Sequence, residues 1–151
     1  MKIVSKSEKQ TIILGKKFAQ HLQGGEIIGL TGNLGAGKTV FIKGMAQGLK
    51  IKQIITSPTF VLMKVYKTNK RESEANLHES QIQWFCHIDA YRLKNGQDLI
   101  NIGVKDYLCR PDTVTVIEWA ERVKNILPKN KISVKIKTGE KNDQRIIDII
   151  K

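Results

Sequence analysis

The stretch IIGLTGNLGAGKTVFIKGMA, residues 27–46, decides the fold of this protein. Its apolar residues 27–30 predict a short strand, and residues 40–49 resume an apolar period typical of a helix. Between them, residues 32–39 read GNLGAGKT and match the pattern GxxxxGK[S/T] of a phosphate-binding loop. Because the motif stands between a strand and a helix, as its mechanism requires, we expect a P-loop rather than a glycine-rich turn that only caps a helix.

Each part of this loop has a chemical task. Gly32, Gly35 and Gly37 can adopt backbone angles closed to other residues, so that successive N–H groups can turn inward around phosphate oxygens. The helix start near Lys38 adds the positive end of its dipole, worth roughly 0.3–1 kcal/mol for a nearby anion. Lys38 adds a full charge, and Thr39 offers a hydroxyl to Mg²⁺. The sequence therefore predicts a site for the phosphates of Mg·ATP.

The rest of the chain alternates predicted strands and helices. Upstream of the loop, Ser5 and Glu8 fit a capping box, which predicts a first helix that ends near Gly24 and Gly25. The polar stretch 68–83 has too few apolar residues for the core, and we expect a hairpin loop or a small inserted helix there. Downstream, the patterns predict strands over 60–66, 84–89 and 113–117, helices over 98–108 and 120–127, and a hairpin from 132–136 and 145–149.

This order of elements predicts an α/β fold: a three-layer, P-loop NTPase-like mixed sheet flanked by helices, with a C-terminal β-hairpin. The 151 residues fit a single domain that spans 1–151. No apolar run reaches the roughly twenty residues of a membrane helix, and the first ten residues lack the features of an export signal, so we expect a cytoplasmic protein. Cys86 and Cys109 stand outside any CxxC or Cys/His cluster, which argues against a metal or disulfide framework.

The net charge of +12 is unevenly spread, since residues 1–50 and 122–151 each carry +6 and residues 51–121 are neutral. Basic ends of this kind would attract a nucleotide, RNA or an acidic protein face. They are equally typical of the solvated surface of a lysine-rich protein.

Two acids could complete the phosphate site, because a P-loop enzyme needs a carboxylate at the end of a neighbouring strand. Glu118 ends one predicted strand and Asp89 ends another, and spacing alone does not choose between them or exclude simple strand-end caps. Ser57 and Thr59 form either a segment that senses the γ-phosphate or an ordinary proline turn. His87 is interpreted as a packed histidine rather than a base, and the lack of an asparagine-lysine-x-aspartate element favours adenine over guanine.

Four motifs in order, GNLGAGKT (32–39), ITSPTF (55–60), HIDAYRL (87–93) and VIEWAER (116–122), resemble those of the bacterial TsaE (YjeE-like) ATPases. The resemblance runs from LGKKFA, residues 14–19, to residues 126–128, and so covers most of the chain. It implies a role in the formation of threonylcarbamoyladenosine (t6A) in tRNA. It also implies weak ATP hydrolysis unless the protein joins its partners TsaB and TsaD, of which TsaD carries out threonylcarbamoyl transfer.

The resemblance also implies roles for single residues. Phosphate binding falls to Gly35, Ala36, Gly37, Lys38, Thr39 and Val40, Mg²⁺ binding to Thr39 and Glu118, and catalysis to Asp89 and Lys38. Thr56, Ser57 and Thr59 become a switch segment, Trp119 a functional aromatic beside the metal ligand, and Ser7 or Thr11 a neighbour of the nucleotide. Asn33, Val40 and Ala120 depart from residues that are frequent in the family, and none of these departures removes a ligand.

Three functions remain open on the sequence. The first is an ATPase subunit that regulates the TsaB–TsaD pair through its nucleotide cycle. The second is a P-loop small-molecule kinase, which would need an acceptor pocket and usually an arginine-bearing lid. The third is a binding module that holds ATP without turnover and contacts tRNA phosphates through its basic ends.

Overall fold

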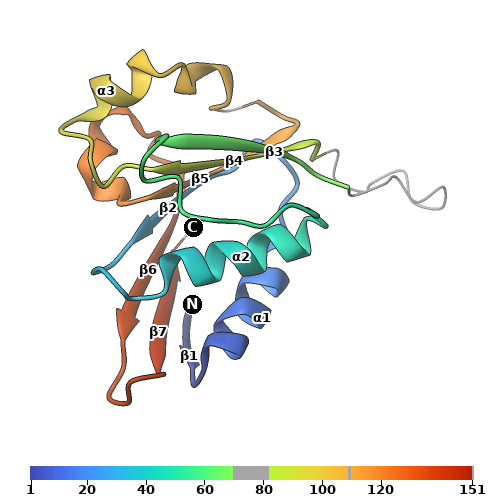
Figure 1. Ribbon diagram of the computed structural model, residues 1–151, viewed down its shortest axis with the longest axis vertical. Helices are drawn as coiled ribbons and strands as arrows, with labels where there is room; N and C mark the ends of the chain where they lie inside the picture. Colours follow the sequence, from blue (N-terminus) through green and yellow to red (C-terminus); the bar gives the residue numbers. More distant parts are fainter. Residues whose placement is uncertain (70–81, 109, 151) are drawn as a thin grey trace.

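A seven-stranded mixed sheet forms the centre of the computed structural model, which describes residues 1–69, 82–108 and 110–150 (Figure 1). Its strand order is β1-β7-β6-β2-β5-β4-β3. Strands β6, β2, β5 and β4 run parallel, whereas β1, β7 and β3 are antiparallel to their neighbours. The bounds are β1 (Lys2–Ser5), β2 (Ile27–Thr31), β3 (Met63–Lys67), β4 (Trp84–Asp89), β5 (Thr113–Glu118), β6 (Ile132–Thr138) and β7 (Arg145–Ile150).

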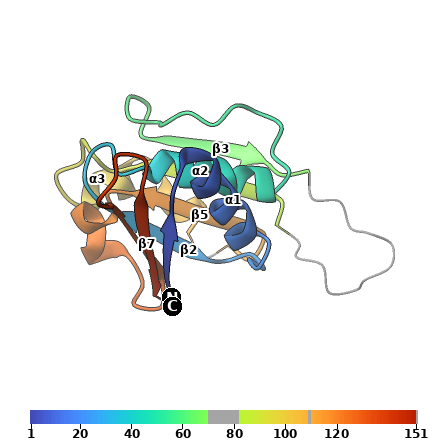
Figure 2. The same ribbon diagram turned by 90° about the horizontal axis from the view of Figure 1, so that it is seen from below.

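Helices cover both faces of the sheet. On one face lie α1 (Glu8–Ala19) and α2 (Lys38–Gly48); on the other lie α3 (Gly96–Asn101) and the 3-10 helices η1 (Val104–Asp106) and η2 (Ala120–Ile126). Successive residues of β4 point to opposite faces, so Phe85 packs in the cluster with α2 and Cys86 in the cluster with α3. Figure 2 shows β1 beside β7 near α1. The predicted three-layer α/β fold with a C-terminal hairpin is confirmed.

Glycines bring α1 and α2 into close contact. A Cβ atom on Gly15 would lie 2.2 Å from the carbonyl oxygen of Phe41, and one on Gly44 would lie 2.1 Å from that of Ile12. Real Cβ atoms do not approach backbone oxygens so closely, so the two helices can adopt this distance only because both positions are glycine. The contact fixes α2, which begins at the phosphate-binding loop, against α1.

The amino-terminal segment differs from the prediction. Residues 2–5 form β1, and Ser5 pairs with Arg145 of β7, so the proposed capping box of Ser5 and Glu8 was wrong. The N-cap of α1 is Ser7, whose side chain accepts a hydrogen bond from the backbone N–H of Gln10. The helix also ends at Ala19 and not near Gly24, because residues 20–26 turn back to reach β2.

Three other elements differ from the prediction, two in their bounds and one in its helix type. The strand predicted over 60–66 begins only at Met63, because the backbone N–H of Leu62 donates to Pro58 and closes a turn. The helix predicted over 98–108 divides at Gly103, whose φ is 83°. The last predicted helix is the 3-10 helix η2.

Most of the predicted polar loop, residues 70–81, lies outside the described residues. None of the helices in the described ranges is long and apolar enough to cross a membrane.

Candidate functional site

The loop after β2 has the backbone that the glycine pattern predicts. Gly32, Gly35 and Gly37 all have positive φ angles, of 144°, 75° and 97°. Gly32 has a second constraint, since a Cβ there would lie 2.1 Å from the carbonyl oxygen of Ile136 in β6. Gly37 is the N-cap residue of α2, so the loop leads directly into the amino-terminal end of that helix. The chain thus presents a helix N-terminus and a glycine-rich backbone at the carboxyl end of the central strand β2, which suits an anion.

The side chain of Lys38 folds back over this loop. Its Nζ donates to the carbonyl oxygens of Gly32 at 2.7 Å and Asn33 at 3.0 Å. The same ammonium lies 3.8 Å from the centre of the Trp119 ring. Burial lowers the pKa of Lys38, while the nearby carboxylates, first that of Glu118, act in the opposite direction. Lys38 is therefore a largely buried cation held between loop carbonyls and an aromatic face.

Glu118 lies beside the first turn of α2. The hydroxyl of Thr39 donates to its carboxylate, at 3.2 Å from Oε1 and 3.0 Å from Oε2. Nε2 of His87 lies 2.8 Å from Oε1 of the same carboxylate. The parallel register places Leu30, the last but one residue of β2, opposite Glu118 in β5, so the acid ends its strand next to the loop. The structure thus brings the predicted pair of Thr39 and Glu118 together.

Asp89 is the register partner of Glu118 on β4, but it binds other groups. The hydroxyls of Ser57 and Thr59 each donate to its Oδ2 at 2.6 Å. The backbone N–H of Tyr91 donates to its Oδ1 at 2.9 Å. The segment around Pro58 is therefore tied to Asp89 through two hydroxyls, which an ordinary proline turn would not require. Thr56 points elsewhere and accepts a hydrogen bond from Lys64 at 2.9 Å.

A small pocket of about 250 Å³ adjoins the loop. Gly35, Gly37 and Val40 line one side of this pocket. The other lining residues are Glu8 and Thr11 of α1, Asp143 before β7, and Arg145 at the start of β7. Of the two residues predicted near the nucleotide, Thr11 lines this pocket. Ser7 is not among its lining residues and caps α1 instead.

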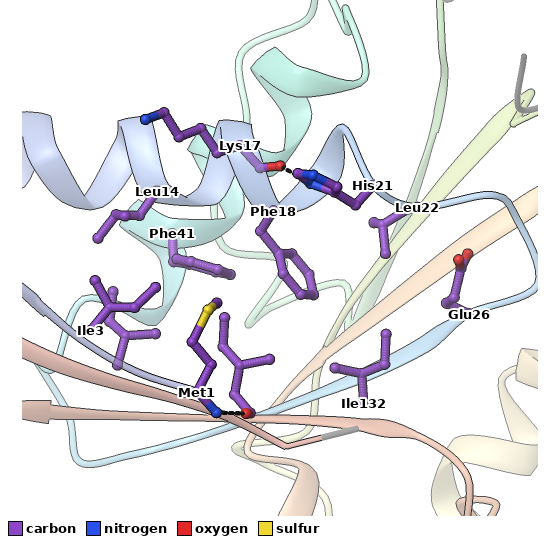
Figure 3. Close-up of a pocket in the computed structure, with 12 residues that line it drawn as sticks. Met1, Ile3, Leu14, Lys17, Phe18, His21, Leu22, Glu26, Phe41 and Ile132 are labelled. Carbon is purple, nitrogen blue, oxygen red and sulfur yellow. Dashed lines mark hydrogen bonds between the residues drawn. The ribbon is translucent and has the colours of Figure 1, made fainter.

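A larger, apolar pocket of about 610 Å³ lies between α1 and strands β1, β6 and β7 (Figure 3). Figure 3 shows Leu14 and Phe18 of α1 above it and Met1 pointing into it. It shares no lining residue with the phosphate-binding loop. The chemistry of the loop therefore belongs to the smaller pocket.

Aromatic and basic side chains follow the two acids, and spacing left their role open. Tyr91 packs against Trp119 with ring centres 5.0 Å apart and ring planes inclined by 47°, and the Arg122 guanidinium lies 5.4 Å from the Tyr91 ring. Arg92 lies 4.5 Å from the ring of Phe60, which is 83% exposed. The contact between Arg92 and Phe60 joins the segment around Pro58 to the residues that follow β4. These contacts link residues far apart in the chain, so no local pattern in the sequence signals them.

Comparisons with known proteins agree with these motifs. The family model described as threonylcarbamoyl adenosine biosynthesis protein TsaE matches residues 5–147. A tRNA threonylcarbamoyladenosine biosynthesis protein TsaE of Treponema pallidum is 38% identical over 138 residues, which cover 91% of this chain and 91% of that protein. The protein of the same name in Aquifex aeolicus is 35% identical, covering 89% and 93%. The crystal structure of Bacillus subtilis YdiB superposes with a TM-score of 0.75 at 28% identity, covering 97% of this chain and 82% of that one.

Proposed function

Because this chain belongs to the TsaE family, we propose that it serves t6A formation in tRNA as an ATP-binding and ATP-hydrolysing subunit. The observation that carries the proposal is the approach of Thr39 in the P-loop to Glu118 at the end of β5, at 3.0 Å. A hydroxyl and a carboxylate in this position are the protein groups with which P-loop enzymes hold the metal of a nucleotide.

The residues present fit Mg²⁺. It prefers oxygen ligands, takes only one or two protein groups and completes its shell with water and phosphate oxygens. Thr39 Oγ1 and the Glu118 carboxylate supply those two groups, and no cluster of three or more His, Cys, Asp or Glu side chains that could hold another metal occurs in the described part of the chain. When bound, the ion would neutralise charge on the phosphates.

The phosphates of ATP would lie against residues 35–40, with Lys38 exchanging its two carbonyl partners for phosphate oxygens. Such an exchange is favourable because a hydrogen bond between two charged groups is stronger than one to a neutral carbonyl. The nucleoside would then extend into the pocket of about 250 Å³ between Thr11 and Arg145. Arg145 lies within 4 Å of the position that a Cβ of Gly37 would take, close enough to reach the phosphates.

Asp89 is the acid that we assign to the attacking water. Its carboxylate is 3% exposed and accepts three hydrogen bonds, two of them from the hydroxyls of Ser57 and Thr59. A carboxylate with such partners can orient a water molecule and accept its proton. Ser57 and Thr59 would sense the γ-phosphate, because the same hydroxyls can turn from Asp89 to a phosphate oxygen.

Partner proteins complete the proposal, with TsaB and TsaD as those partners. Phe60 and Val61 follow the switch segment directly and are 83% and 61% exposed. Exposed apolar side chains beside a site favour a protein interface. A partner that docks there would contact the residues next to Ser57 and Thr59, and we expect it to accelerate ATP hydrolysis that is slow in the isolated protein.

The test compares ATP hydrolysis by the wild type, Asp89→Ala and Glu118→Ala, each with and without TsaB and TsaD. We expect stimulation of the wild type by the partners and loss of turnover in both variants. Lys38→Ala should abolish ATP binding. Equal wild-type rates with and without partners, or unchanged ATP affinity in Lys38→Ala, would contradict the proposal. Phosphorylation of a metabolite in their absence would point instead to a kinase.

A further inference from the structure

His87 has a partner that the proposed function leaves unexplained. Its side chain is completely buried in β4, and its Nε2 lies 2.8 Å from Oε1 of Glu118. An ionised carboxylate can only accept hydrogen bonds, so the ring nitrogen is the donor. The expected packed histidine is therefore also bonded to the acid beside Thr39.

The sheet brings this pair together. In the β4–β5 register His87 lies opposite Val116, and Glu118 is two residues further along β5. Side chains two residues apart point to the same face of a strand, so His87 follows Phe85 toward the α2 side, and Glu118 follows Val116. The imidazole then reaches diagonally forward to the carboxylate, which lies at the end of the strand.

The other ring nitrogen supports a specific role. Nδ1 of His87 is buried and has no hydrogen-bond partner among the described residues. A residue that only fills space here would carry no polar atoms, as is true of its neighbours Phe85 and Val116. Within the part of the chain that the structure describes, the one hydrogen bond of the ring is to Glu118, so any effect of its polarity is exerted on that carboxylate.

The surroundings of His87 also argue against a direct role in the reaction. Its side chain has no exposed surface, whereas Asp89 and Glu118 each keep 3%, and its Nδ1 has no polar partner among the described residues that could relay a proton. Its donor atom is already engaged with Oε1, while Oε2 lies 3.0 Å from the hydroxyl of Thr39. His87 thus holds Oε1 of the carboxylate, while the Thr39 hydroxyl lies near both oxygens, 3.2 Å from Oε1 and 3.0 Å from Oε2.

We propose that His87 is a positioning residue that orients the Glu118 carboxylate for Mg²⁺. The inference rests on the proposed function, in which Glu118 and Thr39 hold the ion. Groups that hydrogen-bond to a metal-binding carboxylate typically change metal affinity or activity by about 10–100-fold when they are removed.

The experiment uses two substitutions of matched polarity. The amide nitrogen of His87→Gln can occupy the position of Nε2, whereas the shorter side chain of His87→Asn reaches only the position of Nδ1. The Mg²⁺ concentration that half-saturates binding of a fluorescent ADP analogue is measured for each, and analogue affinity is measured again in EDTA. We expect His87→Asn to need about 10–100-fold more Mg²⁺, with unchanged affinity in EDTA and near wild-type behaviour in His87→Gln.

Three outcomes would overturn the inference. The first is a folded His87→Asn with the Mg²⁺ dependence of the wild type, and the second is an equal loss in both variants. If His87→Asn does not fold, ¹⁵N-histidine spectra of the wild type replace it, with His87→Gln to assign the signal. These spectra should show the ring hydrogen on Nε2 and a change in the Nε2 chemical shift when Mg²⁺ and ADP are added. The third outcome that would overturn the inference is a ring hydrogen on Nδ1 alone, or an Nε2 chemical shift that does not change. Wild-type nucleotide binding that ignores Mg²⁺ would instead contradict the proposed function.

Discussion

Asp89 and Glu118 lie directly opposite each other on β4 and β5, and yet their carboxylates share no hydrogen-bond partner among the described residues. Glu118 faces the first turn of α2 and the imidazole of His87. Asp89 faces the hydroxyls of the segment around Pro58. The spacing of the chain did not show which of the two acids has which role, whereas their different hydrogen-bond partners distinguish them. Substitution of each acid should therefore give a different defect.

The first prediction separates hydrolysis from binding at Asp89. In Asp89→Asn the amide cannot accept a proton from water, so we expect kcat for ATP in the presence of partners to fall by about 10²–10⁴-fold. The affinity for Mg·ATP should stay within a few-fold of the wild type, because the hydrogen bonds of the Asp89 carboxylate come from Ser57, Thr59 and Tyr91 and not from the P-loop. Steady-state turnover and equilibrium binding measure the two effects. Asp112→Asn, at the opposite end of β5, is the control, and a loss of binding equal to the loss of turnover in Asp89→Asn would contradict the assignment.

The second prediction concerns pH. Burial lowers the pKa of Lys38, and only the protonated ammonium attracts phosphate. The affinity for ATP should therefore decline as pH rises. The decline should begin at a lower pH than it would for a lysine with the ordinary pKa of 10.5. Lys38→Arg tests the origin of the decline, because a guanidinium stays protonated throughout this range. Titrations of ATP binding at a series of pH values should show a flatter profile for Lys38→Arg, and an identical profile would assign the decline to another group.

The third prediction uses Trp119 as an optical reporter. Its ring lies 3.8 Å from Nζ of Lys38, and phosphates that draw the ammonium away will change the surroundings of the indole. Addition of ATP should therefore shift the tryptophan fluorescence of the wild type. Trp84→Phe should keep the shift and Trp119→Phe should abolish it, since these are the two tryptophans of the chain. Persistence of the shift in Trp119→Phe would show that the signal arises elsewhere.

The fourth prediction concerns the exposed ring of Phe60. Phe60→Asp places a charge on a side chain that is 83% exposed, so the fold should tolerate it. Stimulation of ATP hydrolysis by a subsaturating concentration of TsaB and TsaD should fall by about fivefold or more, which corresponds to the loss of more than about 1 kcal/mol expected for one of the few dominant contacts of an interface. Basal hydrolysis should not change. Phe60→Tyr keeps the ring and should keep the stimulation; full stimulation of Phe60→Asp would exclude this surface.

The fifth prediction concerns the contact between α1 and α2. A methyl group on Gly44 would lie 2.1 Å from the carbonyl oxygen of Ile12, and the helices would have to separate. Alanine is intrinsically favoured over glycine in a helix by about 1 kcal/mol, so a decrease in stability would report the clash alone. We expect Gly44→Ala to lose about 1–3 kcal/mol of unfolding free energy in urea titrations. Lys43→Ala, on the exposed side of α2, should be nearly neutral, and a stabilised Gly44→Ala would contradict the packing described.

The sequence predicted those parts of the molecule that local pattern determines. The loop backbone, the strands β4 and β5 and the C-terminal hairpin follow from glycine spacing and apolar periodicity, and the structure confirms them. Strand β1 was missed because its four residues become a strand only by pairing with β7, more than a hundred residues away in the chain. The helix-like signal from Ser5 and Glu8 correctly indicated a first helix, but it placed the helix start at Ser5, where β1 ends, and not at Ser7.

The site shows the same division between local and distant information. Lys38 and Thr39 follow from the motif. Which acid faces Thr39 depends on strand order and register, which chain spacing does not contain. The contact of His87 with Glu118 is a diagonal one between neighbouring strands, so the sequence predicted a packed histidine but not its partner. The contact of Tyr91 with Trp119 involves a tryptophan with a positive φ at the N-cap of η2, a backbone conformation that a tryptophan in the sequence does not signal.

The five residues from Thr56 to Phe60 join the two events that the proposal assigns to this protein. Their inner side bonds to Asp89 through Ser57 and Thr59, and their outer side presents Phe60 to solvent. A ligand that moves the inner hydroxyls and a protein that docks on the outer ring then act on one short segment. Thermodynamic reciprocity sets the result: the factor by which a docked partner changes the affinity for nucleotide must equal the factor by which nucleotide changes the affinity for that partner.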